Sequence, residues 1–340
     1  MADSESSATP SLALPPRIAR GSRSMRIVVI SMAVIIAALP FVASTYVLSL
    51  LVLASIYAVL AIGLDLFMGQ TGQVSFGHNA FAALGGYATA ILTTAHNWPP
   101  LAALAFSIVI SVIAALIVGV RTLQLRGHYL AMATLALDMI AYTLAVQLTS
   151  LTNGFVGITG IAPLGIGPLE LTSDLQYYYV VWIIVALGIW SSFRIKDSRV
   201  GRALGAIAGN EEAASALGIN AARLKLIAFT ISAAYAAVAG ALMAHFIGFL
   251  SPEVFGLDLV TLLFAMLFVG GIGTIYGPVI GAVLIALLPA ILGPLADYRQ
   301  LAYGVILLAV IMFAPSGAFR LIADLAERLF DRSSEGEKHG

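Results

Sequence analysis

The sequence predicts an all-α protein with many membrane-spanning helices. Its mean hydropathy is +1.00, and 60% of its residues are hydrophobic while only 10% are charged. The apolar residues come in repeated runs of roughly 17–25 residues, which is the length that an α-helix needs to cross about 30 Å of hydrocarbon. A transmembrane β-barrel would instead show short segments of alternating polarity. We therefore expect a polytopic helical membrane protein.

We expect about ten transmembrane helices, each covering one apolar run. The expected spans are 27–44, 46–68, 80–94, 101–120, 128–149, 177–193, 226–248, 258–274, 277–293 and 300–314. With the N-terminus in the cytoplasm, every one of the 17 basic residues except Arg299 lies on the cytoplasmic side. Because Lys and Arg near the ends of spans are retained on that side, this distribution predicts that both termini are cytoplasmic.

The chain divides into three parts. Residues 1–25 are rich in Ser, Ala and Pro, which predicts a disordered cytoplasmic tail, and residues 26–315 form the transmembrane domain. In residues 316–340, apolar side chains recur every three or four positions among charged ones, which predicts an amphipathic helix on the inner membrane interface. The first span also resembles a cleavable signal sequence, and its cleavage would leave every later orientation unchanged.

Residues 194–225 form the longest charged stretch, in a cytoplasmic loop between two predicted spans. Asn210 can cap a short helix, and Glu211 and Glu212 in its first turn complement the positive end of the helix dipole. Gly218 is placed to end this helix in a left-handed conformation, and Asn220 can cap the following span. A short rigid helix tethered to two spans can pass a push from a soluble partner into the membrane. We therefore expect a coupling element here.

A polar, uncharged segment separates the second and third predicted spans. It contains Gln70, Thr71, Gln73, Ser75, His78 and Asn79. Such a segment cannot face lipid, so it is either a cytoplasmic turn or a broken element that lines a cavity. The absence of charge favours the cavity, where amide side chains and backbone groups could bind a zwitterionic solute weakly. His78 has no partner at a metal-binding spacing, so we expect no metal site there.

Two carboxylates, Asp65 and Asp138, fall inside predicted spans. A charged side chain at the bilayer centre costs about 2.5–3.5 kcal/mol, so each must face protein or a water-filled cavity. Either residue could line a path or gate, or could form a structural hydrogen bond between helices. The position of Asp65 near the end of its span favours the structural reading, whereas both readings stay open for Asp138.

Glycines recur between the eighth and ninth predicted spans, at Gly273, Gly277 and Gly281. Small residues at this spacing allow two helix backbones to approach closely, while Pro278 and the neighbouring glycines prevent one continuous helix. We therefore expect a tight turn that leads into a closely packed helix pair.

The motifs of several other protein classes are missing from the sequence. It has no cysteine and no G-x-x-x-x-G-K-[ST] phosphate loop, and its five histidines form no H-E-x-x-H pattern. We therefore expect no catalytic residue and no cofactor in this chain, and the lack of a large basic cluster argues against nucleic-acid binding. A secondary transporter driven through Asp65 and Asp138 remains an alternative.

Five segments resemble the branched-chain amino-acid ABC transporter permease family, specifically its LivM-type subunit, and cover roughly residues 50–315. They are Gly63–Phe81 (GLDLFMGQTGQVSFGHNAF), Leu123–Ala131 (LQLRGHYLA), Leu151–Gly154 (LTNG), Ala244–Pro252 (AHFIGFLSP) and Gly270–Pro278 (GGIGTIYGP). Residues 212–218, EAASALG, are also similar to the E-A-A-x-x-x-G coupling helix of bacterial ABC-importer permeases. Asp65 departs from the Asn more usual in the family, and Gly205 and Gly209 replace charged residues, which is expected to loosen the loop.

The resemblance implies a permease subunit in the bacterial inner membrane, which takes branched-chain amino acids from a periplasmic binding protein. It also implies a second homologous permease and two ATPase subunits that hold Mg–ATP. A urea or short-amide importer is the alternative within this class. The expected coupling residues are Asn210, Glu211, Glu212, Ala213, Ala214 and Gly218. The expected translocation path is formed by Gln70, Thr71, Gln73, Ser75, His78, Asn79 and Asp138.

Overall fold

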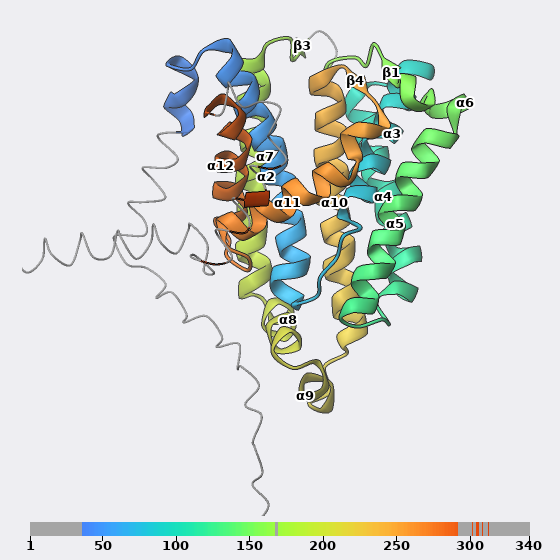
Figure 1. Ribbon diagram of the computed structural model, residues 1–340, viewed down its shortest axis with the longest axis vertical. Helices are drawn as coiled ribbons and strands as arrows, with labels where there is room; N and C mark the ends of the chain where they lie inside the picture. The colour runs from blue at the N-terminus through green and yellow to red at the C-terminus, as the bar shows by residue number, and fades with distance from the viewer. Residues whose placement is uncertain are drawn as a thin grey trace, which may run out of the picture.

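The protein folds into a bundle of helices, shown in a computed structural model that describes residues 36–166 and 169–291 and positions 301, 304, 305, 308 and 312 (Figure 1). The longer helices are α2 (Thr45–Thr71), α3 (His78–Ala95), α4 (Pro100–Thr122), α5 (His128–Gln147), α7 (Asp174–Asp197), α10 (Ala221–Ile247), α11 (Leu257–Gly270) and α12 (Gly277–Ile291). The shorter helices are η1 (Leu39–Phe41), α6 (Thr149–Thr152), η2 (Gly154–Val156), α8 (Arg199–Gly209), α9 (Glu211–Ala216) and η3 (Pro252–Phe255).

Two small antiparallel sheets complete the fold. Strand β1 (Ile158–Thr159) pairs with β4 (Phe249–Leu250), and β2 (Gly165–Ile166) pairs with β3 (Leu169–Glu170). All four strands lie at the end of the bundle opposite α9 (Figure 1).

The eight predicted spans between residues 46 and 293 each correspond to one helix, so the all-α polytopic prediction is confirmed for this part of the chain. Six helical segments among the described residues are long and apolar enough to cross a membrane. The predicted spans 27–44 (in large part) and 300–314, and both predicted tails, lie outside the described residues.

Helices α2 and α10 form the centre of the bundle. In the most apolar windows of these helices 67% and 61% of the residues are buried, against 22% in α4, α5 and α7. Small residues bring α3 and α10 into close contact, because a Cβ placed on Gly85 would lie 2.5 Å from the Cα of Ala237. Close backbone approach of this kind is how membrane helices gain van der Waals contact without a hydrophobic driving force.

The glycine-rich segment forms the tight turn and the packed helix pair that its sequence predicts. Helix α11 ends at Gly270, and Gly271 and Gly273 adopt positive φ angles of 107° and 74° in the turn that follows. A Cβ placed on Gly270 or Gly281 would collide with backbone atoms of the facing helix. Only glycine fits at these contacts, so α11 and α12 pack backbone to backbone.

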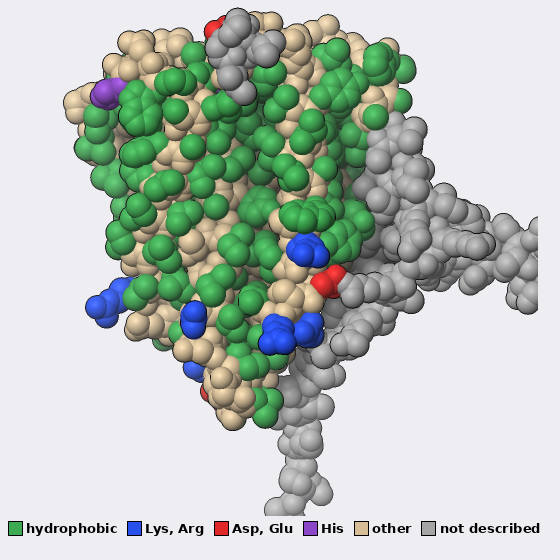
Figure 2. Space-filling model, turned by 180° about the vertical axis from the view of Figure 1, so that it is seen from behind, with side chains coloured by type: hydrophobic (Ala, Val, Ile, Leu, Met, Phe, Trp, Pro, Cys, Tyr) green, Lys and Arg blue, Asp and Glu red, His purple; other side chains and the backbone are tan. Residues whose placement is uncertain are grey.

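The two ends of the bundle differ in charge. The Lys and Arg residues of the described ranges all lie at the end that carries α8 and α9, which we call the basic end; they are Arg121, Arg126, Arg194, Lys196, Arg199, Arg202, Arg223 and Lys225. Figure 2 shows the Lys and Arg side chains of one face in its lower part, with many hydrophobic side chains on the surface above them. Exposed apolar side chains such as Ile117 and Ile183 are placed to contact lipid.

Candidate functional site

Helix α9 is a short capped helix at the tip of the basic end, as its sequence predicts. Asn210 Oδ1 accepts the backbone N–H of Ala213 at 2.9 Å, and Gly218 follows the helix with a φ of 85°. Asn220 Oδ1 then accepts the N–H of Arg223 at 3.0 Å and so caps α10. The predicted caps are confirmed.

An ion-pair cluster holds α9 against the bundle. Lys225 Nζ lies 2.9 Å from Glu211 Oε1, and the side chain of Lys225 is only 2% exposed. Arg126 extends from the α4–α5 connection and contacts Glu211 at 3.6 Å and Glu212 at 3.4 Å. Glu211 therefore faces the bundle, whereas the side chain of Glu212 is 85% exposed.

The remaining motif residues divide between the inner and the outer surface of α9. Ala214 is buried against the bundle, whereas Ala213 is exposed. Leu217, directly after the helix, is an apolar side chain with 83% of its surface exposed. This surface is open to a partner.

Helix α8, which precedes α9, was not expected from the sequence. Ser198 caps it by accepting the N–H of Gly201, and Leu204 and Ile207 bury one face of it against the bundle. Gly205 and Gly209, which were expected to loosen the loop, both lie within this helix. The signal that could have found α8 is its strong amphipathic pattern, which the glycines obscured.

The polar segment after α2 returns into the bundle. Gly72 ends α2 with a φ of 68°, and residues 73–77 then run back along the bundle to the start of α3 (Figure 1). At that point His78 Nε2 lies 2.9 Å from the carbonyl oxygen of Leu60, which precedes Thr71 by three turns of α2. At 1.5 Å per residue the chain has returned by roughly 16 Å. The segment therefore lies inside the bundle beside the apolar helix α2, and is not a turn beyond the end of that helix.

Two hydrogen bonds fix this segment to further helices. The N–H of Phe76 donates to Thr134 Oγ1 of α5 at 3.0 Å, and His78 Nδ1 lies 3.0 Å from Ser232 Oγ of α10. His78 thus joins α2, α3 and α10 through both ring nitrogens. Its geometry is that of an anchor between helices.

The other predicted path residues differ in their location and in whether their polar atoms have hydrogen-bond partners. Thr71 is buried and donates to the carbonyl of Phe67 at 2.7 Å, while Gln70 points into a small cleft on the other side of α2. Gln73 is half-buried, and Ser75 and Asn79 are buried. In the described structure Ser75 Oγ and Asn79 Oδ1 have no hydrogen-bond partner. Buried polar atoms without a partner are costly, which makes these two atoms candidates for binding a solute or water.

Asn79 connects α3 to α5 and to the start of α11. Its Nδ2 donates to the carbonyl oxygens of Phe255 and Gly256 at 2.6 and 3.2 Å, and its side chain also interacts with the buried carboxyl of Asp138. Asp258 follows two residues after Gly256 in the first turn of α11 and is exposed. If the Asp258 carboxylate faced lipid at mid-depth, its insertion would cost about 2.5–3.5 kcal/mol. The favourable interaction with the N-terminal end of the α11 dipole contributes only about 0.3–1 kcal/mol and does not offset this cost.

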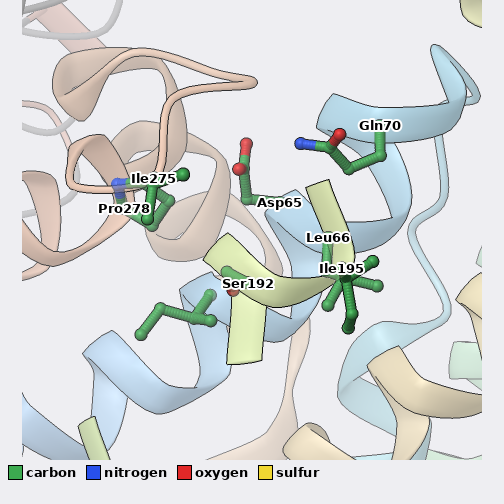
Figure 3. A pocket seen from close by; sticks show the side chains of 8 residues that line it. Asp65, Leu66, Gln70, Ser192, Ile195, Ile275 and Pro278 are labelled. Atoms are coloured by element: carbon green, nitrogen blue, oxygen red, sulfur yellow. The ribbon is translucent and has the colours of Figure 1, made fainter. Parts of the chain in front are cut away.

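Asp65 forms a structural hydrogen bond, which is the interpretation that its position near the end of the span favoured. Its Oδ1 accepts the N–H of Gly273 at 2.6 Å, and Lys196 Nζ donates to the carbonyl oxygen of Gly273 at 2.9 Å. Figure 3 shows Asp65 and Gln70 beside a small cleft between α2, α7 and the α11–α12 turn. The cleft is lined by Ile62, Asp65, Leu66, Gln70, Ser192, Ile195, Ile275 and Pro278. Asp65 therefore fixes the glycine turn to α2.

The described residues contain no group of three or more His, Asp or Glu side chains that could hold a metal ion.

An apolar helical bundle with a polar broken element inside it and an open capped helix at one end has the architecture of a membrane permease. Residues 46–315 match the family described as the permease component of branched-chain amino acid transport systems. The match spans most of the chain, and the protein belongs to this family.

Curated relatives agree with the family. The chain is 28% identical to the high-affinity branched-chain amino acid transport system permease protein LivM of Escherichia coli K12, over 89% of this chain and 76% of LivM. It is also 28% identical to LivH of the same organism, over 78% of this chain and 91% of LivH, and 26% identical to BraD of Pseudomonas aeruginosa, over 78% of this chain and 92% of BraD. No solved structure matches the chain significantly.

Proposed function

We propose that the chain is the membrane-spanning permease subunit of an ATP-driven importer of branched-chain amino acids in the bacterial inner membrane. Its family and the names of its relatives support this assignment. Ten transmembrane helices with both termini in the cytoplasm fit the distribution of basic residues, and this distribution supports a cytoplasmic location for the basic end. The partners are a second homologous permease, a periplasmic binding protein and two separate ATPase subunits, which hold Mg–ATP and carry out the hydrolysis.

The observation that carries the proposal is the way α9 is held. Both of its ends are capped, Glu211 is paired to the buried Lys225, and Arg126 ties the helix to the α4–α5 connection. A helix so constrained moves with the spans on either side of it. The residues that remain open, Glu212, Ala213 and Leu217, are then the ones that contact an ATPase.

Helix α8 supplies a direct route from α9 to the polar segment. Its residue Ala208 packs against Gly72, since a Cβ placed on Gly72 would lie 3.3 Å from the Cα of Ala208. Gly72 is where the broken element begins. Displacement of α9 by an ATPase would therefore reach the broken element through α8.

The translocation path is proposed to run beside the broken element, along α3 and α5. Gln73, Ser75, Asn79 and Asp138 supply its polar groups, and Ser75 and Asn79 each offer an atom that has no hydrogen-bond partner among the described residues. His78 and Thr71 support the path by fixing the segment, because their polar atoms are already engaged. Gln70 is proposed to offer its side-chain amide to the cleft that it lines together with Asp65. This cleft lies on the other side of α2.

The test is reversal of the exposed charge on α9. The Glu212→Arg variant, assembled with its ATPases and binding protein in proteoliposomes, is expected to lose leucine uptake and to retain less ATPase on purification, although the permease still inserts. The variant also loses the ion pair between Glu212 and Arg126. Because this pair is exposed, its loss by itself changes the stability of the chain little.

Gln124→Arg is the matched control, because it adds a positive charge at an exposed position of the basic end outside α9. Normal leucine uptake by Glu212→Arg would refute the coupling role of α9. Uptake of urea or a short amide in place of leucine by the native complex would keep the coupling mechanism and change the solute.

A further inference from the structure

Asp258 lies at the middle of the bundle, as a chain of contacts shows. Asp138 stands halfway along α5 and interacts with Asn79, the second residue of α3. Asn79 in turn bonds to the carbonyls of Phe255 and Gly256, which immediately precede α11. Asp258 is in the first turn of that helix, so it shares the depth of Asp138.

Asp258 is nevertheless exposed on the surface of the single chain, as is Glu253 in η3. A carboxylate at this depth cannot face hydrocarbon, so the surface that carries it faces water or another subunit. Thr261, three residues further along α11 and also exposed, continues the same surface.

The charges around Asp258 are of one sign. Within the described ranges, Lys and Arg occur only at the basic end, whereas Asp138, Glu253 and Asp258 lie at mid-depth or beyond it. Asn79 and Asp258 lie in the first turns of α3 and α11, whose N-termini are each equivalent to about half a positive charge. Asn79 adds a buried carbonyl oxygen with no partner in the described structure. Among the residues that the structure describes, this part of the molecule offers acceptors without a cationic side chain.

We propose that Asp258 and Asp138 face the translocation path at mid-membrane and, with the Asn79 carbonyl oxygen, recognise the ammonium group of the transported solute. The inference rests on the proposed import of amino acids. It specifies further that the path recognises the ammonium group of the solute. Oxygen acceptors with net negative charge favour an ammonium group and oppose anions. A zwitterion without net charge passes when its ammonium end is bound here.

The test uses the fact that the chain has no cysteine. Thr261→Cys places one thiol a single turn from Asp258, and the full complex in nanodiscs gives reagents access from both sides. Two methanethiosulfonates of similar size, one with a trimethylammonium and one with a sulfonate group, report the local field by the ratio of their reaction rates. Ile183→Cys, on the exposed apolar face of α7, is the lipid-facing control.

We expect Thr261→Cys to react much faster than Ile183→Cys in at least one nucleotide state, and to prefer the cationic reagent. For unit charges roughly 6 Å apart in a water-like medium, adding Asp258→Asn should lower the ratio of cationic to anionic rates about tenfold. A change in the acidity of the thiol alters both rates equally and cancels in this ratio.

Three outcomes would overturn the inference: no reaction at Thr261→Cys in any nucleotide state, a rate equal to that of the lipid-facing control, or a ratio unchanged by Asp258→Asn. The labelling needs no solute, so it separates this inference from the proposed function. A native complex that fails to import leucine would refute the function, whereas the rate ratio would still report the field. Asp258→Asn is further expected to reduce leucine uptake at least tenfold while the ATPases stay bound, and uptake equal to that of the native complex would also contradict the inference.

Discussion

Removal of the Glu211 carboxylate tests how firmly α9 is held. The Glu211→Gln change leaves the Lys225 ammonium, whose side chain is 2% exposed, without its partner at 2.9 Å. Breaking a fully buried pair in this way costs about 3–5 kcal/mol, whereas an exposed pair contributes about 0.2–1 kcal/mol. Because the side chain of Glu211 is 14% exposed, we expect an intermediate cost of about 2 kcal/mol. At 1.4 kcal/mol per factor of ten, this corresponds to a roughly 30-fold more frequent opening of α9.

The opening can be measured as cysteine reactivity. Ala214 lies on the inner face of α9 and is 2% exposed, so Ala214→Cys in this cysteine-free chain reacts with a water-soluble maleimide only when α9 opens. When opening and closing are fast, the labelling rate follows the opening equilibrium. We therefore expect Glu211→Gln to raise this rate roughly 30-fold in the purified chain, by the conversion used above.

Two further variants serve as controls. Arg126→Gln removes a partner whose side chain is 59% exposed, so about 0.5 kcal/mol and a roughly twofold faster rate are expected. Lys225→Met combined with Glu211→Gln removes the stranded cation and should bring the rate back toward that of the native chain. Equal labelling rates in Glu211→Gln and Arg126→Gln would refute the argument, because they would show that burial adds nothing to the pair.

The remaining predictions concern backbone contacts and are checked by thermal denaturation of the purified chain. Asp65→Ala should be less stable than Asp65→Asn, because alanine leaves the Gly273 N–H unpaired at a cost of about 1–3 kcal/mol; equal stability would show that this bond is dispensable. Gly281→Ala should destabilise the chain, since its Cβ would meet the Met266 carbonyl. Gly205→Ala in α8 should instead stabilise it by about 0.5–1 kcal/mol, because nothing lies within 4 Å; the opposite order for the two glycines would contradict the packing.

Local signals in the sequence were sufficient for the long helices and for the caps around α9. Apolar runs located the eight long helices between residues 46 and 293, because burial in lipid requires continuous apolar surface, whereas they did not reveal α8. Asn210, Gly218 and Asn220 marked the ends of helices through bonds that span only a few residues. The turn at Gly273 was predictable for the same reason, since close backbone approach excludes any residue larger than glycine.

Contacts between distant segments could not be predicted in this way. The pairing of Arg126 with Glu211, and that of Asp65 with Gly273, joins residues far apart in the chain, so no local pattern records either. The depth of Asp258 depends on the return of the chain to the bundle at His78 and on the bond from Asn79. Asp258 begins the expected span 258–274, and no local pattern in the sequence marks it as part of a site. The roles of the path and coupling residues stay predictions.

The glycine contact between α3 and α10 has a consequence for how the bundle can deform. With Gly85 pressed on Ala237, and His78 bonded to both Leu60 and Ser232, helices α2, α3 and α10 behave as one stiff block. Helix α5 is much less buried and meets the polar segment through the bond from Phe76 to Thr134. We therefore expect α5 to tilt relative to this block, which moves as one body, whenever the interior changes its access from one side of the membrane to the other.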